Sequence, residues 1–140
     1  MKFKDVGYKT NLKELHSYQI NKLVNLALEW CSNRFGFRKY TPNIYFSITK
    51  ERLDENASGW YEPSRHEPEI TININKNINV QDLINTIIHE YTHYLQPKLQ
   101  KSYNPSDPGF DYKTNPFEVE AREVAKKYTR KCYIQIKPKF

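Results

Sequence analysis

The sequence predicts one α+β domain spanning residues 1–140, and three observations support this prediction. A chain of 140 residues can bury one hydrophobic core but is too short for two. Apolar residues recur at helical spacing in some segments and alternate at strand spacing in others. The connections between the predicted strands leave no room for a crossover helix, which favours a small, mainly antiparallel sheet.

The first half of the chain is predicted to hold one helix followed by three strands. Apolar side chains recur every three or four residues over 12–34, and Gly36 ends this helix. Residues 43–49 (NIYFSIT) and 69–75 (EITININ) alternate apolar and polar side chains, as half-buried strands do. Between them, residues 58–63 (SGWYEP) are predicted as a short third strand.

A second helix is predicted between Asn79, a good N-cap residue, and Pro97, which stops it. One complete face of this helix is apolar and is expected to pack against the core. The residues of that face are Val80, Leu83, Ile84, Ile87, Ile88, Tyr91, Tyr94 and Leu95.

A long loop and a third helix follow. Residues 97–116 are rich in Pro, Asn, Asp and Ser, and loops of this length inside a domain are often functional. The third helix is predicted over residues 116–128, with Asn115 as its N-cap and a proline in its first turn. Residues 132–138 (CYIQIKP) are predicted as a last strand.

The positive charge of the chain is concentrated at its C-terminal end. The net charge is +6, and the last seventeen residues hold six basic side chains and no acidic one. These are Lys126, Lys127, Arg130, Lys131, Lys137 and Lys139. Such a basic C-terminal segment can bind the phosphates of a nucleic acid, or it can be a solvated surface without a ligand.

The first ten residues carry no apolar run, and no apolar stretch approaches the length that crosses a bilayer. We therefore expect a cytoplasmic protein without a membrane partner. Cys31 and Cys132 are expected to be reduced thiols, although a single bridge between them remains open.

Two histidines, His89 and His93, lie four residues apart in the second predicted helix. They project away from the apolar face, so core packing does not require them. Imidazoles at positions i and i+4 point the same way and can bind one zinc ion, Zn2+. Glu90 would then lie beside the open coordination position, as general base and acid. The alternatives are satisfied core histidines and solvated surface histidines.

The stretch HEYTH (89–93) resembles the H-E-x-x-H signature of zincin metallopeptidases. No histidine follows it, which excludes zincins whose third ligand is a histidine. A carboxylate remains, as in gluzincins, and the third predicted helix offers Glu118, Glu120 and Glu123. These three cannot all bind one ion, because residues two apart on a helix point in widely different directions.

Glu118 is favoured as the third ligand, and Glu120 remains the alternative. Glu118 lies on the flank of Ala121 and Ala125, where small side chains would let the histidine helix approach closely. The stretch EVEAREVA (118–125) is similar to the E-x-x-A-[DN]-x-x-A helix of phage-repressor-cleaving metallopeptidases and HtpX-type membrane proteases, whose first Glu binds zinc. Arg122 departs from this pattern, because those families carry there an Asp or Asn that supports the first histidine.

The resemblance implies a minimal zincin-like domain and a zinc-dependent endopeptidase of phage or bacterial origin, acting in a host cytoplasm or virion. It would hydrolyse protein or peptide substrates with metal-activated water. In such enzymes the sheet edge beside the zinc helix binds the substrate as an added strand, a role that EITININ (69–75) would take.

Two further expectations concern residues outside these motifs. Tyr103 and Tyr112, in the loop before the third helix, are candidates to stabilise the oxyanion. His16 and His66 are expected at the surface.

The alternative function is a nucleic-acid-associated binding module, in which the basic C-terminal segment binds the nucleic acid and the zinc site is structural or vestigial.

Overall fold

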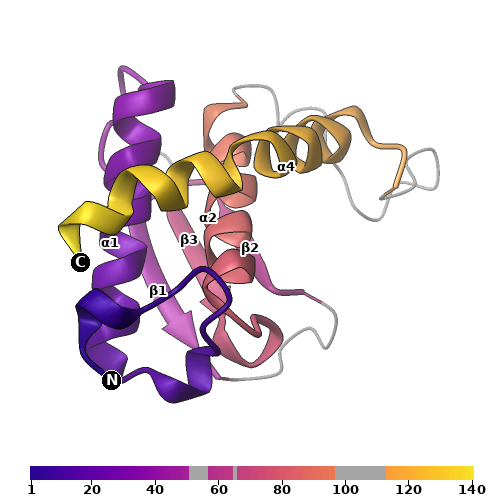
Figure 1. Ribbon diagram of the computed structural model, residues 1–140. Coiled ribbons are helices and arrows are strands. Elements are labelled where there is room, and N and C mark those ends of the chain that lie inside the picture. Colours follow the sequence, from indigo (N-terminus) through magenta and orange to yellow (C-terminus); the bar gives the residue numbers. More distant parts are fainter. Residues whose placement is uncertain (51–56, 65, 97–112) are drawn as a thin grey trace.

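The computed structural model describes residues 1–50, 57–64, 66–96 and 113–140. The helices in this part of the chain are α1 (Ser17–Phe35), α2 (Val80–Leu95) and α4 (Pro116–Ile136). The strands are β1 (Tyr45–Thr49), β2 (Gly59–Glu62) and β3 (Glu69–Asn73). Short 3-10 turns lie at Phe3–Asp5, Leu12–Glu14, Ile74–Lys76 and Lys137–Lys139. The predicted α+β class is confirmed (Figure 1). Within the described ranges, no helix is both long and apolar enough to cross a bilayer.

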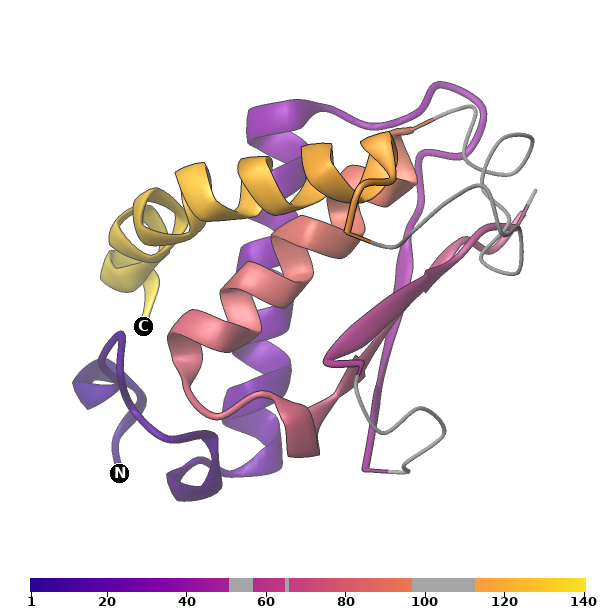
Figure 2. The same ribbon diagram turned by 90° about the vertical axis from the view of Figure 1, so that its right-hand side faces the viewer.

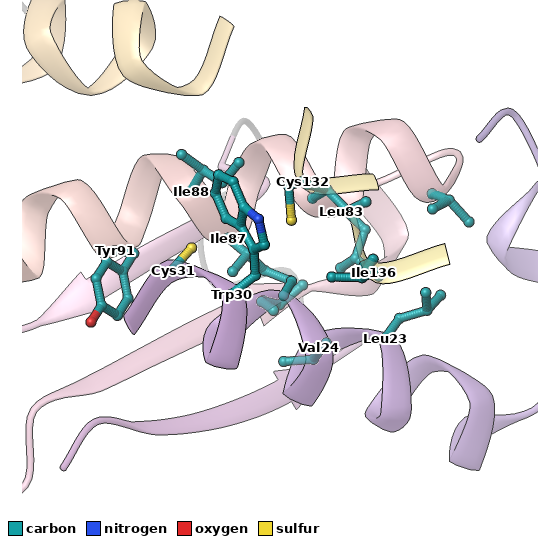
Figure 3. Packing of buried hydrophobic residues seen from close by; sticks show 14 of the residues in the cluster. Leu23, Val24, Trp30, Cys31, Leu83, Ile87, Ile88, Tyr91, Cys132 and Ile136 are labelled. Carbon is teal, nitrogen blue, oxygen red and sulfur yellow. The ribbon is translucent and has the colours of Figure 1, made fainter. Parts of the chain in front are cut away.

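Helix α2 lies at the centre of the molecule, between the sheet and α4 (Figure 2). It packs against β2 and β3 on one side and against α4 on the other, while α1 contacts both α2 and α4. Figure 3 shows side chains from α1, α2 and α4 meeting in one core. Cys31 and Cys132 are buried there as free thiols, so the open alternative of a bridge between them is wrong.

Three predicted helix ends are confirmed, namely the starts of α2 and α4 and the end of α1. Each depends on a residue at the helix end itself. The Asn79 carboxamide oxygen accepts a hydrogen bond from the Asp82 amide at 2.9 Å, which caps α2. Asn115 caps α4 in the same way, accepting from the Phe117 amide at 2.9 Å. Gly36 follows α1 with a φ of 82°, a conformation that glycine adopts without strain.

The first helix begins later than its apolar periodicity predicts. Residues Leu12–Glu14 form a 3-10 turn, and α1 starts only after His16, whose backbone is extended. The His16 amide donates to the side chain of Gln19 at 2.8 Å, which caps a new helix at this point. The Leu12 amide donates to the carbonyl of Ile78 at 3.0 Å, so the turn is tied to the segment before α2.

The sheet is mixed, and the prediction of a mainly antiparallel sheet is wrong. The strand order is β1-β3-β2, with β3 parallel to β1 and antiparallel to β2. The chain reverses direction in β2, and β3 then runs between β1 and β2 in the same direction as β1. A parallel pair therefore forms without the crossover helix that the sequence argument required.

Strand β3 is the central strand, so the prediction that EITININ forms a sheet edge is wrong. Its residues Ile70, Thr71, Ile72 and Asn73 are all buried, because both faces and both edges of the strand are covered. Alternation of apolar and polar residues does not reveal this burial. Strand β2 is the neighbour of β3 that packs most closely on α2.

The C-terminal stretch CYIQIKP is not a strand. Helix α4 continues through it to Ile136, and its buried side chains keep the helical period. Cys132 and Ile136, four residues apart, extend the buried face of Ala125 and Thr129 into the core. Packing of this face against the other helices overrides the local alternation of apolar and polar residues. The basic C-terminal segment is therefore largely helical.

Candidate metal centre

The close packing of α2 and α4 brings three side chains together. Ala121 and Ala125 are fully buried where α4 faces α2, and their small side chains allow the two helices to approach. Glu118, one turn before Ala121, is buried on the same side of α4. It faces His89 and His93, which project from successive turns of α2.

The Glu118 carboxylate bridges the two imidazoles. Its Oε2 atom lies 3.0 Å from Nε2 of His89, and its Oε1 atom lies 3.0 Å from Nε2 of His93. The imidazole centroids are 4.9 Å apart, with the ring planes at 76°. One donor atom from each of the three residues lies within 4.8 Å of the other two. The three donors therefore surround one point in space.

These donors fit a metal ion. In a tetrahedral site with bonds of about 2.1 Å, neighbouring ligand atoms are about 3.4 Å apart. The two nitrogen–oxygen distances of 3.0 Å are close to this value, so small side-chain shifts make room for an ion. Two imidazoles and one carboxylate also form the three-residue set that leaves a fourth position open. The group can therefore hold a metal ion.

The charges of the site favour an anionic Glu118. Burial raises the pKa of this carboxyl, but hydrogen bonds and charge interactions with His89 and His93 outweigh burial and lower it to about 2. For His93, burial lowers the pKa, and hydrogen bonds to Glu118 and Gln96 together with the charge of Glu90 raise it overall. The carboxylate is thus ionised at neutral pH and can serve as an anionic ligand.

Glu90 lies beside this group but is not one of its three donors. Glu90 is only 7% exposed. Burial raises the pKa of its carboxyl group, and the charges of His89 and His93 partly oppose this rise. A carboxyl with a raised pKa exchanges protons more readily near neutral pH than an ordinary glutamate does. The arrangement therefore places a potential proton acceptor next to three potential metal ligands.

The other sequence candidates take different places. Glu120 is exposed and accepts a hydrogen bond from Gln96 Nε2 at 2.9 Å, away from the three donors. Glu123 is exposed. Arg122 donates to the carbonyl of Lys113. The candidates Tyr103 and Tyr112 lie outside the described residues, whereas His16 and His66 are exposed as predicted.

Of the two alternatives for the histidines, the solvated surface pair is wrong in this structure, and the satisfied buried pair stays open. The side chains of His89 and His93 are only 13% and 6% exposed, so neither is a solvated surface residue. Both ring systems face the carboxylate of Glu118 at 3.0 Å, an arrangement that metal ligands and satisfied buried histidines share.

Sequence reasoning missed Gln96, the residue just after α2. It is 7% exposed, and its Oε1 atom lies 2.8 Å from Nδ1 of His93. Its Nε2 atom donates to the Phe117 carbonyl at 3.1 Å as well as to Glu120. The available signal was its position three residues after His93, where side chains share one side of a helix.

A buried polar network fixes the sheet against α2 near the site. The Thr86 hydroxyl, one turn before Glu90, donates to Asn77 Oδ1 at 2.7 Å. The side-chain nitrogen of Asn77, Nδ2, donates to the backbone carbonyls of Ser58 and Asn73 at 2.9 and 2.8 Å. Because Ser58 precedes β2 and Asn73 ends β3, the network ties both strands to the helix that carries the histidines.

Gly59 lets β2 approach α2 closely, and Gly59→Ala should destabilise the protein. A Cβ atom at this position would lie 2.6 Å from Thr86 Cγ2 and 2.9 Å from the carbonyl oxygen of Thr71. The backbone oxygen cannot turn away, so the strand must shift, at about 1–3 kcal/mol of unfolding free energy. Chemical denaturation should measure this loss.

The control is Gly7→Ala, whose added Cβ would meet nothing closer than Thr10 Oγ1 at 3.4 Å. This control should leave stability unchanged or raise it by up to about 1 kcal/mol. Equal stabilities of the two variants would contradict the close packing of β2 on α2.

Comparisons with protein-family models, with curated proteins and with solved structures found no match. The donor atoms, their burial and their charges define the chemistry that is open to the site. These atoms can bind one cation through three protein ligands, with a buried carboxyl beside it.

Proposed function

We propose that the protein is a zinc-dependent endopeptidase whose metal ligands are His89, His93 and Glu118. The observation that carries this proposal is the approach of both Nε2 atoms to one buried carboxylate at 3.0 Å. Structural zinc sites in proteins are almost always closed by four protein ligands, whereas catalytic sites keep one position open. The resemblance of HEYTH and EVEAREVA to the gluzincin motifs supports the same conclusion.

Glu90 would be the general base and acid of the reaction. A bound zinc ion would supply Lewis acidity, which lowers the pKa of water and polarises the scissile carbonyl. Glu90 would take a proton from the attacking water and deliver it to the departing nitrogen of the peptide. Its burial supports this role, because a raised pKa makes the carboxylate a stronger base than an ordinary glutamate.

The substrate class that suits this site is an extended peptide segment. Among the described residues, β2 pairs with β3 alone, so its other side is the sheet edge next to α2. Peptides bind to such edges by adding a strand, held by backbone hydrogen bonds. A Cβ atom built on Gly59 of β2 would lie 3.7 Å from Glu90 Cγ, so this strand runs beside the proposed base.

The proposal is tested by metal content together with hydrolysis. The purified protein should bind about one zinc ion per chain, as expected for three ligands meeting at one point. It should also cleave an unstructured protein or a peptide library, with cleavage sites read by mass spectrometry. A chelator should stop cleavage and added zinc should restore it. Wild-type protein that stays metal-free after zinc titration would overturn the proposal.

A nucleic-acid-associated binding module is the second candidate function. The observation that favours it is the exposure of Lys126, Lys127, Arg130 and Lys131 along α4. Other basic side chains of this segment are engaged within the protein: Lys139 pairs with Glu29 at 3.5 Å, and Lys137 donates to backbone carbonyls. Tight, salt-sensitive binding of nucleic acid without peptide hydrolysis would favour this function over the first.

A further inference from the structure

We infer that Gln96 and Glu120 form a support that holds the His93 imidazole in the orientation and tautomer needed for metal binding through Nε2. This inference rests on the proposed zinc site and assigns Gln96 and Glu120 as positioning residues. The support consists of two hydrogen bonds in series, from His93 to Gln96 and from Gln96 to Glu120. It links the end of α2 to the first turns of α4.

The direction of the Gln96 amide follows from its neighbours on α4. Its Nε2 atom lies 3.1 Å from the Phe117 carbonyl oxygen and 2.9 Å from an oxygen of the Glu120 carboxylate. A backbone carbonyl and a carboxylate are both acceptors, so the donating NH2 group must face them. The Oε1 atom of Gln96 is thereby left facing His93.

The orientation of the Gln96 amide determines which ring nitrogen of His93 carries the hydrogen. The Oε1 atom of Gln96 lies 2.8 Å from Nδ1 of His93 and can only accept. Nδ1 must therefore carry the hydrogen, which leaves Nε2 to bind the metal. Nε2 is the atom that faces Glu118, the other proposed ligand, at 3.0 Å. Hydrogen bonds of this kind fix the tautomer and ring orientation of metal-binding histidines.

Burial and charge make this support effective. Gln96 and His93 are 7% and 5% exposed, so water competes little for their hydrogen bond. The negative charge of Glu120 polarises the amide and makes its oxygen a stronger acceptor, which increases the electron density that the imidazole offers to a metal. Helix α4 thus supplies one ligand directly through Glu118 and orients a second through Glu120.

Glu120 thus has a role at the site without being a ligand. At position 122, where the helices that this segment resembles carry an Asp or Asn, the present chain has Arg122, which donates to the Lys113 carbonyl. The described structure therefore provides its hydrogen-bonded support at the second histidine, through residues that the motif comparison does not include.

The test compares the zinc dissociation constants of four variants, measured by competition with a chromophoric chelator. Gln96→Met removes the amide at nearly the same side-chain length and should weaken zinc binding about 10- to 100-fold. Glu120→Leu should weaken it less, because it removes only the partner of the amide. Glu120→Gln keeps an oxygen acceptor but not the charge, so it should bind zinc more tightly than Glu120→Leu. Glu123→Leu, on an exposed position of the same helix, is the control and should bind like wild type.

Two further readouts separate positioning from general stability. The melting temperatures of metal-free Glu120→Leu and Glu120→Gln, which alter an exposed side chain, should change little, whereas a purely structural role would lower stability without a specific loss of affinity. In zinc-loaded, 15N-labelled wild type, long-range 1H–15N spectra should show the His93 proton on Nδ1.

Wild-type affinity in Gln96→Met, or a His93 proton on Nε2, would overturn the support by Gln96 and Glu120 while leaving the proposed zinc centre intact. If Gln96→Met does not fold, equal affinities of Glu120→Leu and Glu120→Gln would overturn it instead. A wild-type protein that binds no zinc would overturn the proposed function and, with it, the role of Gln96.

Discussion

Glu90→Gln is expected to slow peptide hydrolysis by a factor of about 10² to 10⁴ and to leave zinc content unchanged. The substitution keeps the size of the side chain but removes the basicity that accepts a proton from water. Glu90 is not one of the three converging donors, so the metal should still bind. Cleavage of the same peptide by equal amounts of zinc-loaded wild type and variant measures the effect.

The stability of Glu90→Gln provides an independent check. Burial raises the pKa of Glu90 above its usual value of 4.5, so its ionisation favours the unfolded chain. Stability is therefore lost as the pH rises from the unfolded pKa through the higher folded pKa. At neutral pH the metal-free variant, which has no charge to bury, should melt at the same temperature as metal-free wild type or higher.

Equal cleavage rates of wild type and Glu90→Gln would show that hydrolysis does not use Glu90.

Glu118→Ala is expected to weaken zinc binding by more than about 100-fold, which is the upper range for the loss of a supporting partner. The variant removes a direct ligand and leaves only two imidazoles on the metal. Glu120→Ala should have a much smaller effect, because Glu120 acts only through Gln96. Chelator competition on both variants gives the comparison, and His93→Ala serves as the reference for a lost ligand, with no measurable binding expected.

The folded state of these variants must be compared before their affinities are interpreted. Glu118 is buried between α2 and α4, so its removal can change the packing of the helices as well as the metal site. Circular dichroism of the metal-free proteins separates the two effects. A larger loss of affinity in Glu120→Ala than in folded Glu118→Ala would contradict the choice of Glu118 as the third ligand.

Local chemistry made much of the fold predictable. Asn79 and Asn115 cap helices through hydrogen bonds that span only two or three residues, and Gly36 ends α1 through its own backbone conformation. The convergence of His89 and His93 follows from the pitch of a helix, since residues four apart share one side. Features of this kind depend on neighbours in the chain, so the sequence alone is sufficient to predict them.

The place of each strand in the sheet depended on contacts distant in sequence. The alternation in residues 69–75 shows which side chains share a face, but it cannot show which strands lie on either side. Insertion of β3 between β1 and β2 made it central and made the sheet mixed. The length of α4 was likewise set by packing, because Cys132 and Ile136 bury their side chains against other helices.

By itself, the sequence determined the α+β class, the N-caps of α2 and α4 and the paired imidazoles of His89 and His93. Only the tertiary structure decided what faces them: the docking of α4 on α2 buries Glu118 between the two imidazoles and leaves Glu120 exposed beside Gln96. Glu118 and Glu120 are both acids in the first turns of one helix, and local energetics favours either equally at that helix end. The packing of two helices distinguishes them, because it buries one side of α4 and exposes the other.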